Sequence, residues 1–258
     1  AVCSGGEVFQ LGNNDCQADS GQLESVLARL DAVLQGKVFA MSPEQWLAIS
    51  GLQAFDAWLR GCDSAAAKLI RHVVDQGWSS VGACESDALP ELESGRLHQA
   101  MQEPAFVEQP QWNGHRCETS CLTRVDTLLM QSLKQQYGNG LLVRLVSRLS
   151  EIAQLSGRLV PDEDLSEDEA AASRPSSPAI GQVSAARGQL IHRVNVDGEK
   201  VTAYQILAPT EWNFHPRGVV ARSLAALEGE AEAIEQQARL LINAIDPCVG
   251  YELHIVEN

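Results

Sequence analysis

The chain has 258 residues, of which 45% are hydrophobic and 21% are charged, as in an ordinary globular protein. Its formal net charge at pH 7 is −15, and an acidic surface repels the phosphates of nucleic acids and of anionic membranes. No apolar run is long enough to span a bilayer and the first residues lack a secretory signal pattern, so we expect a cytoplasmic protein. The seven cysteines are irregularly spaced and form no C-x-x-C pair, which disfavours a structural zinc site.

Hydrophobic residues recur at helical spacing through most of the first 160 residues. The clearest start signal is Ser42-Pro43-Glu44-Gln45, where a capping serine precedes a proline and Gln45 can complete a capping box. Residues 84–116 hold prolines, glycines and scattered polar residues, which predicts a loop with one short helix. The predicted helices span residues 20–36, 42–61, 64–76, 124–136 and 140–155.

An acidic, serine- and proline-rich segment follows from Pro161 to Pro178, and we expect it to be mobile. Beyond it, residues alternate as in strands over 189–194 and 201–207, with Asp197-Gly198 placed as a hairpin turn. A last helix is predicted over 219–245. Together the elements predict an α+β fold, mainly a helical bundle with a small β-hairpin at its side. The helical residues 1–160, the loop 161–180 and residues 181–258 are expected to pack as one domain.

Four separated stretches carry a resemblance to a known family. Residues 185–192 (A-A-R-G-Q-L-I-H) and 208–213 (A-P-T-E-W-N) resemble E-A-P-R-G-x-L-x-H … V-P-[ST]-x-W-N of the large subunits of nickel–iron hydrogenases. Residues 246–254 (D-P-C-V-G-Y-E-L-H) are similar to the closing D-P-C-x-x-C-x-x-H of that family, and residues 118–124 (E-T-S-C-L-T-R) to its E-x-G-P-L-A-R. The order and approximate spacing agree over residues 118–254, which is a stronger signal than any single match.

The departures from the family pattern imply a site without nickel. In the hydrogenases, four thiolates from two C-x-x-C motifs hold nickel, and two of the four bridge to an iron that carries cyanide and carbon monoxide. Here Tyr251 stands at the second cysteine of the closing motif. The N-terminal I-C-G-x-C-x-x-x-H aligns with residues 49–57, where Ser50, Gln53 and Ala57 occupy the functional positions. Cys248 alone remains, so we expect neither bound nickel nor hydrogen cleavage.

A shortened relative of the large subunit with lost nickel ligands resembles the HupK/HoxV family of hydrogenase expression/formation (maturation) proteins. The resemblance implies a scaffold rather than an enzyme, which transiently carries an Fe(CN)2(CO) fragment to the hydrogenase large subunit. It also implies maturation partners of the HypC/HypD type. The chain stops four residues after His254, which leaves little for the endopeptidase that trims the catalytic subunit. The alternative is a metal-free interaction protein that mimics the large subunit and docks maturation factors.

The resemblance places the candidate metal site around Cys248, whose thiolate would hold iron; the alternative is a buried thiol in a closing turn. Cys121 is the expected second thiol, and Cys117 would share a helical face with it if that stretch is helical. Either could instead be an ordinary core cysteine. His254 is a candidate for the ligand shell and is as readily explained as a surface histidine.

Arg187 matches a family arginine that lies over the metal site, where a guanidinium can donate to cyanide nitrogen. An ion pair with a carboxylate is the alternative for this residue. The Pro209-Thr210 pair matches a family position that binds the other cyanide, through the backbone N–H and hydroxyl of Thr210.

Two further features of these stretches are expected to be structural. Glu118 is expected to anchor Arg124 or Arg116, and Trp212-Asn213 to pack and tie a turn. The chain contains no G-x-G-x-x-G, P-loop, G-x-S-x-G or H-E-x-x-H pattern, so nothing else in it argues for catalysis.

Overall fold

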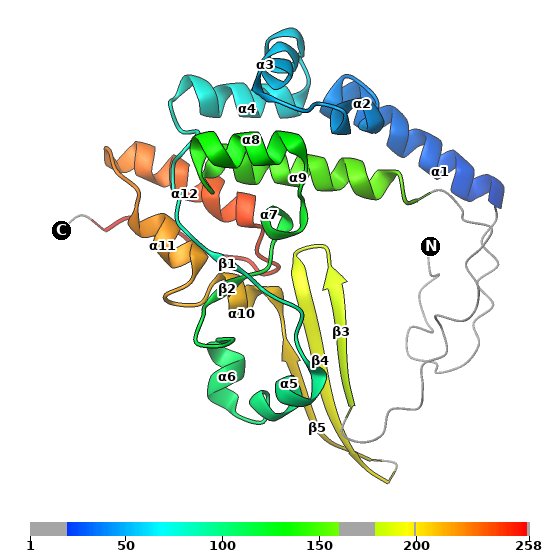
Figure 1. Cartoon of the computed structure of the whole chain (residues 1–258), viewed down its shortest axis with the longest axis vertical. Coiled ribbons are helices and arrows are strands. Elements are labelled where there is room, and N and C mark those ends of the chain that lie inside the picture. Colours follow the sequence, from blue (N-terminus) through cyan, green and yellow to red (C-terminus); the bar gives the residue numbers. More distant parts are fainter. Residues whose placement is uncertain (1–19, 160–178, 199, 257–258) are drawn as a thin grey trace.

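The computed structural model describes residues 20–159, 179–198 and 200–256. Its longer helices gather at one end of an elongated molecule, and a three-stranded antiparallel sheet reaches away from them (Figure 1). This arrangement confirms the predicted α+β class, a mainly helical bundle with a small sheet. The acidic segment from Pro161 to Pro178, expected to be mobile, lies outside the described residues.

In the described part of the chain, most helices precede the three-stranded sheet, with the short strands β1 and β2 among them, and three helices follow it. Before the sheet come helices α1 (Ser20–Val33), η1 (Leu34–Phe39), α2 (Pro43–Leu47), α3 (Leu52–Gly61), α4 (Ala65–Asp75), α5 (Ser94–Ala100), α6 (Pro104–Glu108), α7 (Cys121–Arg124), α8 (Leu128–Tyr137) and α9 (Leu141–Ser156). The strands are β1 (Asp87–Ala88), β2 (Cys117–Glu118), β3 (Ala179–Ala185), β4 (Gly188–Asp197) and β5 (Lys200–Leu207), and they precede α10 (Pro209–Asn213), α11 (Val219–Ala225) and α12 (Ala231–Ile245).

Helix α9 is the centre of the bundle, and its predicted span of 140–155 is confirmed. It is contacted by α2, α4, α7, α8 and α12, so it is buried around more of its circumference than one apolar stripe would require. Its first turn is fixed by the preceding loop, because the N–H groups of Leu141 and Leu142 donate to the carbonyls of Val81 and Ser79. Gly140 is needed there, since a Cβ at this position would lie 2.7 Å from the Ser79 carbonyl oxygen.

Two of the first helix predictions are wrong in their boundaries. Gly36 does not end the first helix, because the chain continues through it as the π-helical turn η1 and leaves at Ala40 with φ of 54°. One glycine in a helix costs about 1 kcal/mol relative to alanine, and burial of Phe39 at the end of this turn outweighs that cost. The predicted helix over 42–61 is two helices, although its capping box at Ser42 and Gln45 is present.

The break between α2 and α3 has a packing reason. Gly51 is extended, with φ of −169°, so the helical path stops before α3 begins. The break allows Trp46 of α2 to pack against Trp58 of α3, with ring centroids 4.6 Å apart in an edge-to-face arrangement. Aromatic packing between distant parts of a segment overrides a local helical pattern, and periodicity alone does not reveal it.

Later helices also begin or divide at points that the sequence pattern does not mark. The helix predicted over 124–136 starts at α8, where Thr127 caps it by accepting from the N–H of Met130. The last predicted helix, 219–245, is divided into α11 and α12 around Gly229, which has φ of 130°. Residues 84–116 hold two short helices, α5 and α6, and the short strand β1. The predicted third helix, with Ser64 as its cap, is confirmed as α4.

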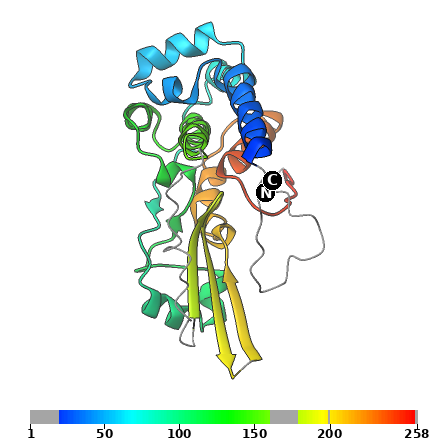
Figure 2. The ribbon, with the colours of Figure 1, turned by 90° about the vertical axis from the view of Figure 1, so that its right-hand side faces the viewer.

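The predicted hairpin is confirmed and has a third strand. β4 pairs antiparallel with both β5 and β3, and a register shift at Asn195/Val196 marks a β-bulge near the hairpin end. One face of the sheet buries Ile191 and Leu207 in a small core with Trp212 and residues of α5. In the view turned by 90°, the three strands extend beyond the helical layer (Figure 2).

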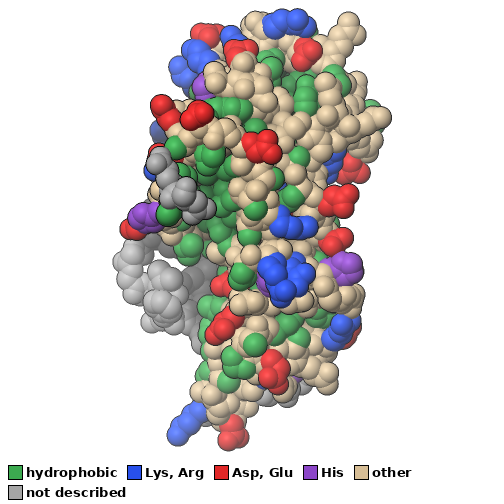
Figure 3. Space-filling view, turned by 90° about the vertical axis from the view of Figure 1, so that its left-hand side faces the viewer, with side chains coloured by type: hydrophobic (Ala, Val, Ile, Leu, Met, Phe, Trp, Pro, Cys, Tyr) green, Lys and Arg blue, Asp and Glu red, His purple; other side chains and the backbone are tan. Residues whose placement is uncertain are grey.

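Charged side chains of both signs are interspersed over one face of the molecule, with apolar side chains between them (Figure 3). The net negative charge therefore does not form a field of a single sign across this face. No helix in the described part of the chain has both the length and the apolar character to cross a membrane.

Candidate functional site

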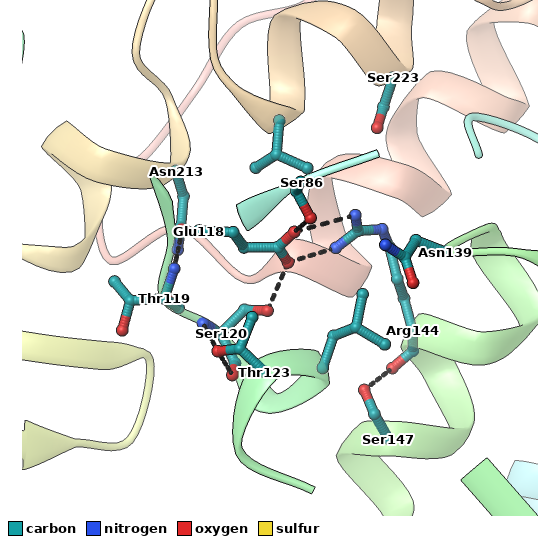
Figure 4. Close-up of polar contacts among 12 residues, drawn as sticks. Ser86, Glu118, Thr119, Ser120, Thr123, Asn139, Arg144, Ser147, Asn213 and Ser223 are labelled. Atoms are coloured by element: carbon teal, nitrogen blue, oxygen red, sulfur yellow. Dashed lines mark hydrogen bonds and ion pairs between the residues drawn. The ribbon is translucent and has the colours of Figure 1, made fainter. Parts of the chain in front are cut away.

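Thr119 joins three of the four stretches that carry the family resemblance. Its side-chain hydroxyl accepts a hydrogen bond from the N–H of Gln189, with an N–O distance of 2.9 Å. The amide of Asn213 bonds both backbone groups of Thr119, accepting from its N–H at 2.9 Å and donating to its carbonyl at 2.8 Å (Figure 4). Residues 118–124, 185–192 and 208–213 are therefore fixed to one another at a buried residue. The predicted structural role of Asn213 is confirmed.

Gly188 allows this junction to close. Its φ of 137° lies in a region that favours glycine, and an added Cβ would lie 2.3 Å from the carbonyl oxygen of Thr119 and 2.9 Å from Pro209 Cβ. The close approach places the turn of Ala186 and Arg187 beside the start of α10. Pro209 and Thr210 are the first residues of that helix.

Cys248 lies against Thr210. The distance between Cys248 Sγ and Thr210 Oγ1 is 2.8 Å, and either group can be the donor. The thiol is exposed, so the alternative of a buried cysteine in a closing turn is wrong. The chain reaches this position directly after α12, through Asp246 with φ of 66°.

Asp246 sits between two guanidinium groups. Arg187 Nε and Arg148 Nη2 each lie 3.3 Å from Asp246 Oδ2. Arg148 also donates through Nη1 to the carbonyl of Asn243 at the end of α12. The ion pair considered for Arg187 is thus present, yet 44% of its side chain stays exposed beside the Cys248 turn. The D-P-C stretch is held to the β3–β4 turn and to α9 by one carboxylate.

Cys121 lies in a network next to the same turn. Its thiol donates to Glu151 Oε2 at 2.8 Å, and Arg124 binds both oxygens of Glu151 and the carbonyl of Ala186. Burial and the hydrogen bond to Glu151 raise the pKa of the Cys121 thiol to about 12. The thiol is therefore protonated near pH 7 and already has a partner.

Cys117 and His254, the other two candidate ligands, lie in different surroundings. Cys117 belongs to strand β2, so it does not share a helical face with Cys121, and that expectation is wrong. It is buried in the small core around Trp212, and burial, with a smaller effect of Asp87, raises the pKa of its thiol to about 11. His254 is exposed, with Nε2 3.3 Å from Glu252 Oε2.

Glu118 has a different partner from those expected. It pairs with Arg144 of α9 through two contacts, Nη1 to Oε1 at 2.6 Å and Nη2 to Oε2 at 3.3 Å, while Ser86 and Ser120 also donate to its carboxylate (Figure 4). Burial opposes its charged form, but Arg144 and the two serines hold the pKa of Glu118 below its usual value. A charge within the apolar run Leu141-Leu142-Val143-Arg144 was the available sequence signal for this residue.

The donors described here do not form a conventional metal site. Across the described ranges 20–159, 179–198 and 200–256, no group of three or more His, Cys, Asp and Glu residues is arranged to hold a metal ion. The segment aligned with the N-terminal hydrogenase motif, 49–57, lies at the break between α2 and α3 and places Ser50, Gln53 and Ala57 where thiols and imidazole would stand. What the site offers is an exposed thiol, a hydroxyl and a guanidinium.

Comparison with known proteins gives a family match that covers three of the four stretches, 185–192, 208–213 and 246–254. Residues 142–254 match the family model described as nickel-dependent hydrogenase. The hydrogenase expression/formation protein HoxV of Cupriavidus necator is 29% identical over 250 residues, 90% of this chain and 63% of that protein. HupK of Azotobacter vinelandii, also a hydrogenase expression/formation protein, is 42% identical over 87 residues, 34% of this chain and 25% of its own. The chain thus spans less than two thirds of the length of these relatives.

Among solved structures, the nickel–iron–selenium hydrogenase of D. vulgaris Hildenborough aligns with 55% of this chain and 36% of its own, with 23% identity and a TM-score of 0.41. HupK of Bradyrhizobium diazoefficiens is 40% identical over 118 residues, 44% of this chain and 33% of that protein. The chain is thus similar to the HoxV/HupK hydrogenase expression/formation proteins, and its residues 142–254 are similar to nickel-dependent hydrogenases.

Proposed function

We propose that the chain acts in the maturation of a nickel–iron hydrogenase, as a non-catalytic scaffold that transiently carries the Fe(CN)2(CO) fragment. The relatives named hydrogenase expression/formation proteins support the coarser part of this proposal. The finer part depends on one observation. The exposed thiol of Cys248 lies 2.8 Å from the hydroxyl of Thr210, at a turn that Asp246 ties to Arg187.

The chemistry of these groups fits a cargo of this kind. A thiolate is the soft donor that iron in such a fragment prefers. Two cyanides and one carbonyl already occupy part of the iron's coordination sphere, so few protein ligands suffice for a bond that must later break. The Thr210 hydroxyl and the exposed part of Arg187 can donate to anionic cyanide nitrogen, and the guanidinium keeps its charge there.

Cys121 is proposed as the second thiol, and its binding of iron would require a proton and a hydrogen bond to be lost. Binding iron would require the thiol to lose a proton that its raised pKa of about 12 retains, and to leave Glu151. Arg124, which holds both Glu151 and the Ala186 carbonyl, would have to yield with it. A move of this network would displace the turn that carries Arg187.

The proposed partners follow from the same role. A scaffold must receive the fragment from maturation proteins of the HypC/HypD type and pass it to the hydrogenase large subunit. The region that resembles a large subunit, residues 142–254, offers those partners a surface like that of the final acceptor.

A second candidate function is a metal-free mimic of the large subunit that docks maturation factors. Two observations favour it: Arg187 already has Asp246 as a partner, and the described residues hold no group of three metal donors. The two candidates differ in one respect that can be measured, which is whether iron with cyanide and carbonyl is bound.

The deciding experiment is an infrared spectrum of the protein purified without oxygen from cells that express the hydrogenase maturation proteins. The scaffold predicts cyanide and carbonyl stretches, which fall where proteins do not absorb, together with iron and without stoichiometric nickel. Cys84→Ala is the matched control for Cys248→Ala and should keep these bands, because Cys84 contacts Ser223 and Val219 instead of the Cys248 turn. Absence of these bands from wild-type protein, when the maturation proteins are active, would favour the mimic.

A further inference from the structure

An open cavity of about 760 Å³ is lined by residues from the end of α5 and from the part of β4 and β5 toward their hairpin turn. Its polar lining is contributed by His98 and Gln102 on one side and, on the other, by residues of the sheet: Arg193, Asn195, Thr202, Tyr204 and Gln205. No aspartate or glutamate is among the described residues that line it. This composition is unusual in a chain with 34 acidic residues against 19 basic ones.

Arg193 is the charged group of this cavity, and its described partners are neutral. The residue is only 5% exposed. Its Nε donates to His98 Nδ1 at 3.1 Å and its Nη1 donates to Gln205 Oε1 at 2.5 Å. Because Nδ1 of His98 accepts this bond, the imidazole is neutral, in agreement with a pKa lowered by burial and by the neighbouring Arg193.

The comparison with Arg144 shows what is missing at Arg193. Arg144 is similarly buried and has the carboxylate of Glu118 within 2.6 Å. Within the described residues, no carboxylate forms an ion pair with Arg193. A buried charge is costly unless an opposite charge lies beside it, so this position favours an anion that comes from outside the described fold.

Asn195 adds a second requirement. Its side-chain oxygen Oδ1 is buried and has no hydrogen-bond partner among the described residues, and the residue lies beside the register shift at which β5 carries one extra residue, Thr202. Bulges re-aim side chains and are frequent beside binding sites. A buried acceptor without a donor is as unfavourable as an unpaired donor. The cavity therefore presents a cation that lacks an anion next to an acceptor that lacks a donor.

We propose that this cavity binds a small oxyanion that also carries a hydrogen-bond donor, such as a hydroxycarboxylate or a protonated phosphate group. The anionic oxygens face Arg193, with the amide of Gln102 as a further donor, and the hydroxyl of the ligand donates to Asn195 Oδ1. This recognition needs no thiol and is independent of the Cys248 turn.

The test is a titration of the full chain with glycolate, with acetate and with inorganic phosphate, by calorimetry and by the shift of the thermal unfolding midpoint. Saturable binding of glycolate or of phosphate, each with a rise in Tm, is the expected result. Acetate, which lacks the hydroxyl, should bind at least tenfold more weakly than glycolate. A preference for phosphate over glycolate identifies a phosphate ligand, and the reverse identifies a carboxylate.

The variants separate this site from ordinary surface attraction. Arg193→Met should reduce affinity at least tenfold and abolish the rise in Tm on addition of glycolate or phosphate, because the cation that faces the anion is removed. Asn195→Ala should abolish the preference for glycolate over acetate, and it remains informative if Arg193→Met does not fold. The matched control is Arg96→Met, which removes an exposed arginine of α5 that stacks on Trp112. Failure of wild type to bind any of the probes, or unchanged binding in Arg193→Met and Asn195→Ala, would overturn the proposal.

Discussion

Glu118 and Arg144 form an ion pair in which both side chains are closed to solvent, at 0% and 1% exposure. The pair links β2 to α9, the central helix of the bundle. Ser86 and Ser120 complete the hydrogen bonding of the carboxylate, so the charge is well satisfied in a site without water access. Glu118 directly precedes Thr119, the junction of the three resembling stretches, so this pair fixes the position of the junction relative to α9.

Removing either partner alone should destabilise the protein strongly. Arg144→Met and Glu118→Gln each leave one buried group without its partner, which lowers the free energy of unfolding by about 3–5 kcal/mol. The double variant should lose less unfolding free energy than the two single variants lose together, because neither group is then left unpaired. Chemical denaturation of the four proteins measures the coupling.

The control for this cycle is the exposed pair of Arg239 and Glu235 on α12. Arg239→Met should change stability by less than about 1 kcal/mol, because solvent screens exposed pairs. Single-variant losses at Glu118 and Arg144 that simply add would contradict a coupled buried pair.

The same pair predicts a pH dependence of stability. The pKa of Glu118 is lowered in the folded protein, so its carboxylate contributes stability above the unfolded pKa of about 4.3 and loses it as pH falls through the lower folded pKa. The difference in unfolding free energy between wild type and Glu118→Gln should be full at pH 7 and shrink progressively below about pH 4. Denaturation at a series of pH values measures it; a difference that does not change with pH would show that Glu118 is not charged in the folded state.

Gly188→Ala should disrupt the junction of the three stretches. A Cβ there meets the Thr119 carbonyl at 2.3 Å, in a backbone region that alanine rarely adopts, and the combined strain is about 3 kcal/mol. The expected result is a lower unfolding midpoint and weaker protection of the Gln189 amide in hydrogen exchange, because its bond to Thr119 is lost.

Gly181→Ala is the matched control for this change. Gly181 is in β3, on the same sheet, and nothing lies within 4 Å of an added Cβ. It should alter stability by no more than about 1 kcal/mol, in either direction. Equal losses at the two positions would mean that the close approach at Gly188 does not hold the junction.

The thiols of Cys248 and Cys121 should differ in reactivity. Cys248 is exposed, whereas Cys121 is partly buried, donates to Glu151 and has a pKa raised to about 12. At pH 8 the alkylating thiolate of Cys121 is roughly a ten-thousandth of the total, so iodoacetamide should modify Cys248 at least tenfold faster. Peptide mass mapping over time separates the two sites.

Glu151→Gln sharpens this comparison. Loss of the carboxylate removes the charge that opposes the Cys121 thiolate, so labelling of Cys121 should accelerate while that of Cys248 stays the same. Labelling of Cys121 as fast as Cys248 in wild type would show that the network around Glu151 is open in solution.

The agreement between sequence and structure has a physical pattern. Helices with clear caps, such as the one that begins after Ser64, were predictable because the signal is local. The break at Gly51, the turn through Gly36 and the division at Gly229 were not, since each depends on packing against parts of the chain that no local pattern contains. Strand β3 was missed because its sequence A-I-G-Q-V-S-A contains too few large apolar residues to show alternation.

The candidate site shows the same division. The resemblance of the stretches to one family predicted that Arg187, Thr210 and Cys248 belong to one region. In the structure, Cys248 lies against Thr210, and Arg187 is connected to the same turn through Asp246. The roles of Arg148 and Glu151 could not be foreseen, because a charged residue on a helix reveals its partner only when the neighbouring element is in place. Pairing of Glu118 with Arg144 instead of Arg124 is another such case.

A comparison of the single variants Arg187→Leu and Arg148→Leu tests whether Arg187 contacts the proposed Fe(CN)2(CO) fragment. Both guanidiniums lie 3.3 Å from Asp246, so either substitution removes one of its two ion pairs. Arg187 adjoins the Cys248 turn and is 44% exposed, whereas Arg148 is tied to the carbonyl of Asn243. If Arg187 donates to a cyanide, Arg187→Leu should leave iron bound and shift the cyanide stretches, and Arg148→Leu should leave them unchanged.

Cys248→Ala should abolish the bands, with a loss of stability of only about 1 kcal/mol because the thiol is exposed. Equal shifts in the two arginine variants would assign the effect to Asp246, and undiminished bands in Cys248→Ala would remove Cys248 from the site and leave the metal-free mimic as the better account.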